Sequence, residues 1–213
     1  QAAAAANASV TAYGSGNAAQ VYFDLYPRKI TLEELDAAYP SMIDALVEHE
    51  GLGLVIGYAP DMTAVALGKH GSRNLHTGEV EGEDPVAAYA PADGPGAASL
   101  ETRIWQLRRV MDFPSAGDLW LISTVYPDGT VAALEELVGS HGGVGGEQTD
   151  AFLFHPADLD VPPTRCSTDV FHILDAHRNS PVPPGGLGGT PSAPGEEESS
   201  WSPRTLGRGP VAG

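Results

Sequence analysis

The amino-acid sequence predicts an α/β fold in which a sheet is flanked by helices. Two observations support this prediction. Short runs rich in β-branched and aromatic residues, such as residues 20–25 and 118–125, alternate with longer stretches whose apolar residues repeat at helical spacing. The 213 residues are 42% hydrophobic, which is enough for the core of one medium-sized domain.

Strands are predicted where β-branched and aromatic residues cluster between turn signals. They are residues 20–25, 52–58, 63–68, 118–125 and 151–156. The second and third runs are separated by a short stretch containing Pro60 and Asp61, so we expect them to form a hairpin. Residues 69–96 are acidic and contain Gly and Pro, which predicts a long loop.

Helices are predicted from capping residues and from apolar residues spaced three to four apart. They begin near Thr31, Pro40, Leu100, Thr130 and either Ser167 or Thr168. Thr31 and Glu34 have the spacing of a capping box. The short helix predicted over residues 130–138 leads directly into the sequence GSHGG at residues 139–143, which we expect at the mouth of the sheet.

Both ends of the chain differ in composition from its middle. Residues 1–12 are small and polar and are interpreted as a linker or frayed end. Of the 35 residues in 179–213, 20 are Pro, Gly or Ser. Such a segment cannot bury enough apolar surface to offset its ordering entropy, so it is predicted to be disordered. The predicted domain therefore covers residues 13–178.

The net charge of −17 limits the partners of this protein. It arises from 28 acidic and 11 basic residues, and such a surface repels phosphate backbones, which excludes a nucleic-acid-coating role. It also suits a protein that concentrates divalent cations, although most acidic charge is solvating. The single cysteine, Cys166, excludes an internal disulfide and a Cys-cluster zinc site. The longest apolar run is too short to cross a bilayer, no signal peptide is recognised, and the compartment is not indicated.

Seven histidines are the candidate metal-binding side chains, and none lies in a self-contained zinc motif. Ordinary structural or solvent-exposed roles are expected for six of them: His49, His70, His76, His155, His172 and His177. Two alternatives stay open at this point. His155 could support a ligand from the end of a strand, and a cationic cluster could contact phosphate; its members are Lys69, His70, Arg73 and His76.

His141 has a different setting, within the sequence GSHGGVGGEQT at residues 139–149. Glycines let other groups approach closely, and glycine-rich loops present backbone N–H groups to anions. The imidazole is therefore interpreted either as a ligand or catalytic group, or as part of a plain flexible turn. The G-x-G pattern at residues 143–145 lacks a further glycine and a helix start, so a dinucleotide-binding loop is rejected.

The run VYPDGTVAALEELVGSHGGVGGEQTDAFLFHP at residues 125–156 resembles the C-terminal region of bacterial alkaline phosphatase superfamily proteins. The branch it resembles is the one of type I phosphodiesterases and nucleotide pyrophosphatases. Earlier segments fit the same branch: GSGNAAQVYFDLYPRKITLEEL, YPSMIDALVEHEGLGLVIGY and HTGEVEGEDPVAAY. The resemblance covers about residues 13–178. It implies an alkaline-phosphatase-like mixed sheet flanked by helices, present here only as its C-terminal part.

The resemblance also implies a metal-dependent phosphoester hydrolase. Members of this family hold two divalent metals, usually zinc, and a Thr or Ser nucleophile attacks phosphorus between them. One of their last ligands is a histidine in a Gly-[Ser/Thr]-His-Gly loop. That position corresponds here to His141, with the glycines keeping the substrate entrance clear. The implied substrate is a phosphoester or pyrophosphate.

Other parts of the family's site have no counterpart in this sequence. It contains no Asp-His dipeptide and no strand-Asp-Gly segment followed by a nucleophile helix, so no catalytic residue and no second ligand are assigned. Together with the missing initial methionine, this predicts a fragment whose site is completed by an N-terminal part of the same domain. The alternative is a non-catalytic relic that acts as a protein-interaction module, which the acidic surface and the Pro/Gly-rich tail would suit.

Overall fold

The computed structural model describes residues 9–90, 99–136, 138–149, 151–157 and 159–179. Its centre is a seven-stranded sheet in the order β1-β2-β7-β3-β4-β5-β6. The strands are β1 (Val10–Ser15), β2 (Ala18–Phe23), β3 (Leu52–Tyr58), β4 (Ala64–Gly68), β5 (Gly71–Asn74), β6 (Val80–Gly82) and β7 (Leu119–Ser123). The α-helices are α2 (Leu32–Ala38), α3 (Met42–Glu48), α4 (Leu100–Met111) and α5 (Ser167–Asn179), and the 3₁₀ turns are η1 (Ala87–Tyr89) and η3 (Glu147–Thr149).

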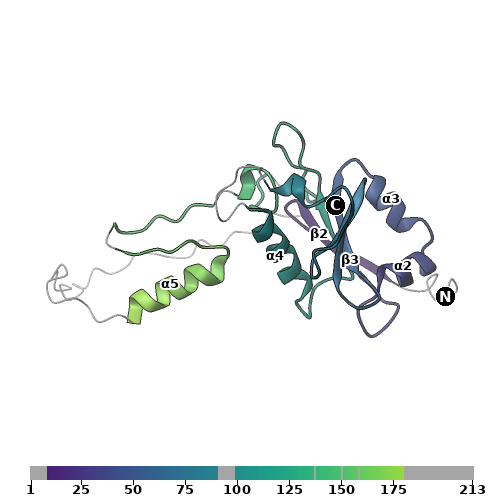
Figure 1. Ribbon diagram of the computed structural model, residues 1–213, viewed down its shortest axis with the longest axis horizontal. Helices are drawn as coiled ribbons and strands as arrows, with labels where there is room; N and C mark the ends of the chain where they lie inside the picture. Colours follow the sequence, from purple (N-terminus) through teal and green to yellow (C-terminus); the bar gives the residue numbers. More distant parts are fainter. Residues whose placement is uncertain (1–8, 91–98, 137, 150, 158, 180–213) are drawn as a thin grey trace, which may run out of the picture.

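Helices cover both faces of the sheet, so the body of the protein has three layers (Figure 1). α2 and α3 lie on one face, where Leu35 and Ile43 pack with Val55 of β3. α4 lies on the other face, where Leu107 packs with Ile56 of β3. Because β3 and β7 are covered on both sides, their sequences LGLVIGY and LWLIS are almost continuously apolar.

The predicted α/β class is confirmed, but the mixed sheet implied by the resemblance is wrong for the described residues. Every ladder in the sheet is antiparallel. The parallel pairing found in the described part is an isolated bridge between Thr31 and Tyr58. β7, the last of the described strands, lies between β2 and β3 and joins the N-terminal hairpin to the β3–β6 meander.

Local sequence signals predicted several elements correctly. At the start of α2, Thr31 Oγ1 accepts from the Glu34 N–H at 3.2 Å, and the Glu34 carboxylate accepts from the Thr31 N–H at 3.1 Å, which is the predicted capping box. The β3–β4 hairpin and helix α4 also form as predicted. At the end of the sheet near α2, the buried Asp118 carboxylate accepts from the N–H groups of Phe23 at 2.8 Å and Ile30 at 3.2 Å.

Four segments differ from the sequence prediction. Residues 10–12, expected in a linker, belong to β1, while residues 1–8 lie outside the described residues. The stretch 69–96, expected as a loop, contains β5 and β6. No helix forms over residues 130–136, and residues 151–156 form no ladder with a described strand.

Tertiary contacts explain why residues 130–136 are not helical. The Leu134 N–H donates to the Gly16 carbonyl at 2.8 Å, and Glu135 Oε1 accepts from the Gly16 N–H at 2.8 Å. Val131 forms an isolated bridge with Val125. These groups form hydrogen bonds with other parts of the chain instead of with one another in a helix. The tertiary contacts therefore outweigh the weak helix propensity of this segment.

A C-terminal arm, formed by residues 151–157 and 159–179, lies apart from the three-layer body (Figure 1). Its base contacts α4, where the Arg165 guanidinium lies 4.5 Å from the Trp105 ring and Gln106 Nε2 donates to the Arg165 carbonyl at 3.1 Å. No described helix, α5 included, is long and apolar enough to cross a membrane.

Helix α5 begins where predicted, but its cap is different. Ser167 is already helical, and the Asp169 carboxylate accepts from the N–H groups of Arg165 at 2.7 Å and Cys166 at 3.3 Å. The carboxylate thus bonds two donors that precede the helix, and these bonds lower the pKa of Asp169. The predicted disordered tail, 179–213, lies outside the described residues except for the last residue of α5.

Candidate functional site

The glycine-rich loop at residues 139–146 lies at the end of the sheet where β1 turns into β2. Ser15 and Ala18 are the paired residues that close this hairpin, and Gly16 and Asn17 form its two-residue turn. Gly16 has a φ of +60°, as the first central position of a type II′ turn requires. The turn therefore needs glycine at this position. Gly16 faces the loop that carries His141.

The His141 side chain is exposed and rests on this turn. A Cβ atom at Gly16 would lie 3.0 Å from His141 Cε1, so the ring occupies space that a larger residue would take. His141 Nε2 lies 2.7 Å from Ser15 Oγ, and His141 Nδ1 lies 2.7 Å from the Gly142 carbonyl oxygen. Both ring nitrogens thus have a partner close to the sheet end.

These two contacts determine what the imidazole can do. A carbonyl oxygen only accepts hydrogen bonds, so Nδ1 carries a proton and donates to Gly142. In the neutral ring the lone pair then lies at Nε2, where the Ser15 hydroxyl donates to it. Metal-binding histidines are held in this manner, with one ring N–H donating to a carbonyl or carboxylate and the other nitrogen bound to the metal.

Asn17 holds the loop that carries His141. Asn17 is 4% exposed, and its Nδ2 donates to the Val144 carbonyl at 2.9 Å. Its backbone carbonyl accepts from the Ser123 N–H of β7 at 2.9 Å. A Cβ atom at Gly143 would collide with Asn17 Oδ1. The loop is therefore pressed against the sheet through Asn17.

The glycines have a different role from the open surroundings predicted from the sequence. That interpretation holds for Gly139, where an added Cβ would meet nothing within 4 Å. Gly145 instead is buried with a φ of +91°, and an added Cβ would lie 2.5 Å from Val125 Cγ2 and 2.6 Å from Tyr89 Cδ1. The second half of the loop is thus glycine-rich because it packs closely.

Two open cavities meet at His141. One, of about 410 Å³, is lined by polar and small residues that include Asn17, Ser140 and Gln148. The other, of about 360 Å³, has an apolar wall that includes Val110 and Trp120. The imidazole lines both cavities, so a ligand in either one could contact it.

The side chains at this site could supply one ligand to a metal, but they do not form a complete metal centre. The other polar side chains around this turn include Ser15, Asn17 and Glu135; Asn17 Nδ2 donates to the Val144 carbonyl, and Glu135 Oε1 already accepts from the Gly16 N–H. Within the described residues, no group of three or more His, Cys, Asp or Glu side chains is placed to hold a metal ion. Nε2 of His141 is the candidate ligand atom.

Three of the four members of the cationic cluster considered as a phosphate contact, Lys69, Arg73 and His76, are paired with carboxylates. Lys69 Nζ lies 2.8 Å from Glu48, Arg73 Nη2 lies 2.5 Å from Asp84, and His76 Nε2 lies 3.0 Å from Asp112; the other ring nitrogen of His76 accepts from a backbone N–H. The bond to Asp84 raises the pKa of Arg73. These three side chains therefore do not form a free cationic patch.

The remaining histidines are not brought to His141. His49 ends α3 and its Nδ1 accepts from the Gly51 N–H at 3.1 Å. His155 Nδ1 donates to the Pro156 carbonyl at 2.9 Å in the exposed arm. His172 and His177 line another cavity beside α5.

Ser15 and Asn17 are the site residues that sequence reasoning missed. They lie 126 and 127 residues from their partners in the loop, so no local spacing connects them to His141. One signal was present, because Gly16-Asn17 between two runs of strand-forming residues is typical of a two-residue hairpin turn.

Comparisons with known proteins do not assign this chain to a family. No protein-family model, no curated protein and no solved structure matches it. The resemblance over residues 13–178 therefore stays a prediction, and the function is inferred from the site.

Proposed function

We propose that this chain is the C-terminal part of a metal-dependent phosphoester hydrolase of the phosphodiesterase or phosphatase type. His141 would supply one ligand to a two-metal site, and the nucleophile and remaining ligands would lie in an N-terminal part of the same domain. The observation that carries this proposal is the geometry of His141. Its Nδ1–H donates to a carbonyl while Nε2 has its lone pair at the rim of two cavities.

In this proposal His141 Nε2 would hold one metal. Divalent metals, zinc in the family that the chain resembles, would supply positive charge to the oxygens of a phosphoester at such a site. The residues of this chain hold the imidazole in place: the Gly142 carbonyl orients Nδ1, Gly16 leaves room for the ring, and Asn17 holds the loop.

The charge of the chain supports a role for cations. A net charge of −17 raises the local concentration of divalent cations and repels anionic phosphoesters. A phosphoester hydrolase with such a surface needs positive charge at its site. No described Lys or Arg lines either cavity at His141, so bound metal is the source of positive charge that the proposal requires.

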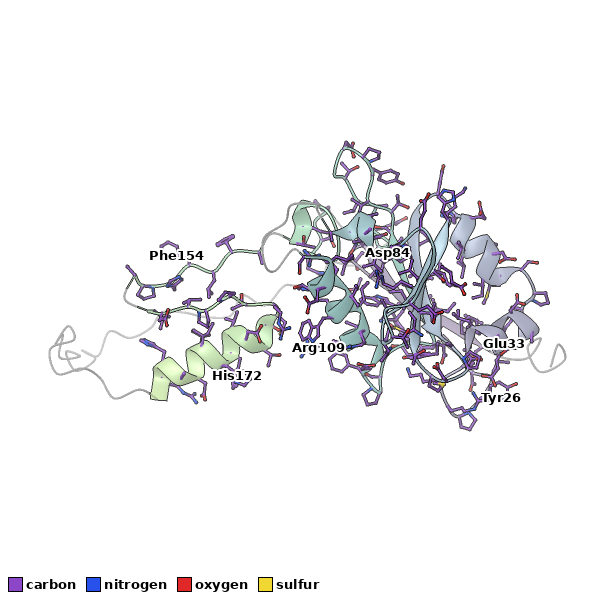
Figure 2. All side chains as sticks on the ribbon, in the orientation of Figure 1. Tyr26, Glu33, Asp84, Arg109, Phe154 and His172 are labelled. Atoms are coloured by element: carbon purple, nitrogen blue, oxygen red, sulfur yellow. The ribbon has the colours of Figure 1, made fainter. Side chains whose placement is uncertain are left out.

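A second candidate function is favoured by the C-terminal arm. Phe152 and Phe154 are 91% and 94% exposed, and Phe171 and Leu174 of α5 are also exposed. Figure 2 shows Phe154 and His172 on this arm, away from the three-layer body. Apolar side chains gathered on an exposed surface are typical of an interaction site. They suit the missing part of a hydrolase domain, and they equally suit a non-catalytic interaction module.

The two candidates are separated by a hydrolysis assay on the native gene product with bis(p-nitrophenyl) phosphate. Removing a residue that hydrogen-bonds to a metal ligand typically lowers metal affinity or activity about 10- to 100-fold. We therefore expect His141→Ala to lower kcat/KM by at least about 100-fold, and a chelator to abolish the activity. His155→Ala is the matched control, because His155 makes the same Nδ1–H contact to the following carbonyl, and it should leave the rate unchanged.

Two results would count against the hydrolase. One is full activity in His141→Ala, which would exclude the imidazole as a ligand. The other is a wild-type protein without metal-dependent hydrolysis, which would favour the interaction module.

A further inference from the structure

We propose that the three consecutive glutamates at residues 196–198 dock, within the same chain, on Arg109 and Arg165 at the junction of α4 and the C-terminal arm. This docking site is separate from His141 and depends neither on a metal nor on hydrolase activity. It assigns a partner to two arginines whose charge the described residues leave unbalanced.

Arg109 and Arg165 place their guanidinium groups against one aromatic ring. Their Cζ atoms lie 5.5 Å and 4.5 Å from the centroid of the Trp105 ring, and Arg109 Cζ also lies 5.5 Å from the centroid of Phe113. Arg109 Nη2 donates to Thr168 Oγ1 at 3.2 Å, which ties α4 to the start of α5. Figure 2 shows Arg109 where the three-layer body meets the arm. Two positive charges from distant parts of the sequence are thus held beside one indole.

The described residues supply no carboxylate that pairs with these two charges. Neither guanidinium group takes part in an ion pair there, whereas Arg28, Arg73 and Arg178 each have a carboxylate partner. The acidic residues that follow the two arginines by three or four positions have other partners: Asp112 is paired with a histidine, and Asp169 accepts from the N–H groups of residues 165 and 166. Two like charges held together without a counterion suit an acidic ligand.

The segment after α5 carries the complementary charge. Residues 180–195 contain no charged side chain, and 12 of these 16 residues are Pro, Gly or Ser. Glu196, Glu197 and Glu198 follow directly and form the one run of three acidic residues in the sequence. Guanidinium groups bind carboxylates through paired hydrogen bonds, so adjacent glutamates can contact both arginines.

The length of the connection suits the distance that it must cover. α5 has 13 residues and is therefore about 20 Å long, and the two arginines lie beside its first turn. A flexible connection of these 16 residues has an r.m.s. end-to-end distance of roughly 20–24 Å, which prolines extend further. The effective concentration of a tethered group is highest when the r.m.s. length of its linker matches the span. The composition and length of residues 180–195 thus concentrate the acidic run at the arginines.

Docking neutralises both guanidinium groups and places the segment across the junction of α4 and the arm. Exposed ion pairs are individually weak, so two of them favour the docked state only about two- to thirtyfold. The contact is therefore reversible, and added salt weakens it because the charges are exposed.

The test uses Cys166, the one cysteine of the chain, to attach a nitroxide spin label beside Arg165. In the ¹⁵N-labelled full chain, the label broadens the amide signals of residues that come close to it. The reference is the variant in which Glu196→Gln, Glu197→Gln and Glu198→Gln are combined, because its linker has the same length. We expect the label to broaden the signals of residues 196–198 at least about twofold more in wild type than in this variant. Salt at about 0.5 M should remove the difference.

Two single variants show whether the arginines are the partner. Arg109→Gln should reduce the broadening as the triple variant does. Arg178→Gln is the matched control, because Arg178 is already paired with Asp175 near the end of α5, and it should leave the broadening unchanged. The indole N–H signal of Trp105 in protein without the spin label is an independent measurement, and it should shift in the triple variant, which alters no described residue.

Two results would overturn the proposal. One is equal broadening of residues 196–198 in wild type and in the triple variant. The other comes from a mixture of a spin-labelled chain without ¹⁵N and a ¹⁵N-labelled chain without the spin label. Broadening of residues 196–198 in that mixture would show that the acidic run binds a second copy of the chain instead of its own.

Discussion

Replacing Gly145 by alanine tests whether the loop that carries His141 is packed against the sheet. Gly145 is buried with a φ of +91°, and an added Cβ would lie 2.5 Å from Val125 and 2.6 Å from the Tyr89 ring. Tyr89 cannot easily yield, because it is buried and its hydroxyl donates to the Ser123 carbonyl at 2.7 Å. The substitution therefore combines an unfavourable backbone with a steric conflict.

The expected loss of stability follows from three contributions. A non-glycine residue in left-handed backbone costs about 1–2 kcal/mol. Overpacking by one methyl group typically costs about 1–3 kcal/mol. Against this, alanine stabilises by about 0.4–1 kcal/mol through the unfolded chain. The free energy of unfolding should thus fall by roughly 1 to 5 kcal/mol.

Urea unfolding followed by tryptophan fluorescence measures this change, since Trp120 lies on β7 in the core. Gly139→Ala is the matched control, because its added Cβ would meet nothing within 4 Å, and it should stay within about 0.5 kcal/mol of wild type. Equal unfolding midpoints for Gly145→Ala and wild type would show that the loop is not packed, and the account of the site would fail.

Two further predictions concern the rest of the domain. Asp118→Asn should lower the free energy of unfolding by roughly 1–3 kcal/mol. The carboxylate accepts from two buried N–H groups, and the single amide oxygen of asparagine can accept from only one of them. An unchanged midpoint of urea unfolding would contradict this prediction. Hydrogen bonds from Arg28 and then from the Thr31 N–H lower the pKa of Glu34 from 4.5 to about 2. The ionised carboxylate therefore stabilises the fold fully above pH 4.5, and this contribution is lost as the pH falls toward 2. The difference in free energy of unfolding between wild type and Glu34→Gln should narrow over that range. A difference that stays constant with pH would refute this prediction.

The elements predicted correctly are those whose signals are local. The capping box at Thr31 and Glu34, the apolar run of β3 and the amphipathic spacing of α4 each depend on residues within a few positions of one another. Backbone capping and burial on one or two faces follow directly from such patterns. Tertiary contacts did not need to be known for these elements.

The elements predicted wrongly depend on distant partners. β5 has the sequence GSRN, which carries no strand signal, and it forms because β4 and β6 pair with it. Residues 130–136 have a helical pattern, but their polar groups bond to Gly16 in the β1–β2 turn. Neither pairing can be read from neighbours in the sequence.

The same contrast between local and distant signals applies to the candidate site. His141 was singled out because a lone imidazole among glycines is a local pattern. The partners that orient and clamp it, Ser15 and Asn17, come from the first hairpin and become visible only when β7 brings that hairpin into the sheet. The close packing of Gly143 and Gly145 was also hidden, because the sequence does not tell an open glycine from a crowded one.

The central proposal is that His141 would supply one ligand, through Nε2, to a metal site completed by residues outside this chain. Zinc titration of the purified chain against a chelating indicator tests it most directly, with His141→Ala measured in parallel. We expect weak binding of at most one zinc, lost in the variant, since the described residues hold no group of three or more ligand side chains. Tight binding of two zinc ions to this chain, or equal binding by His141→Ala, would contradict the claim.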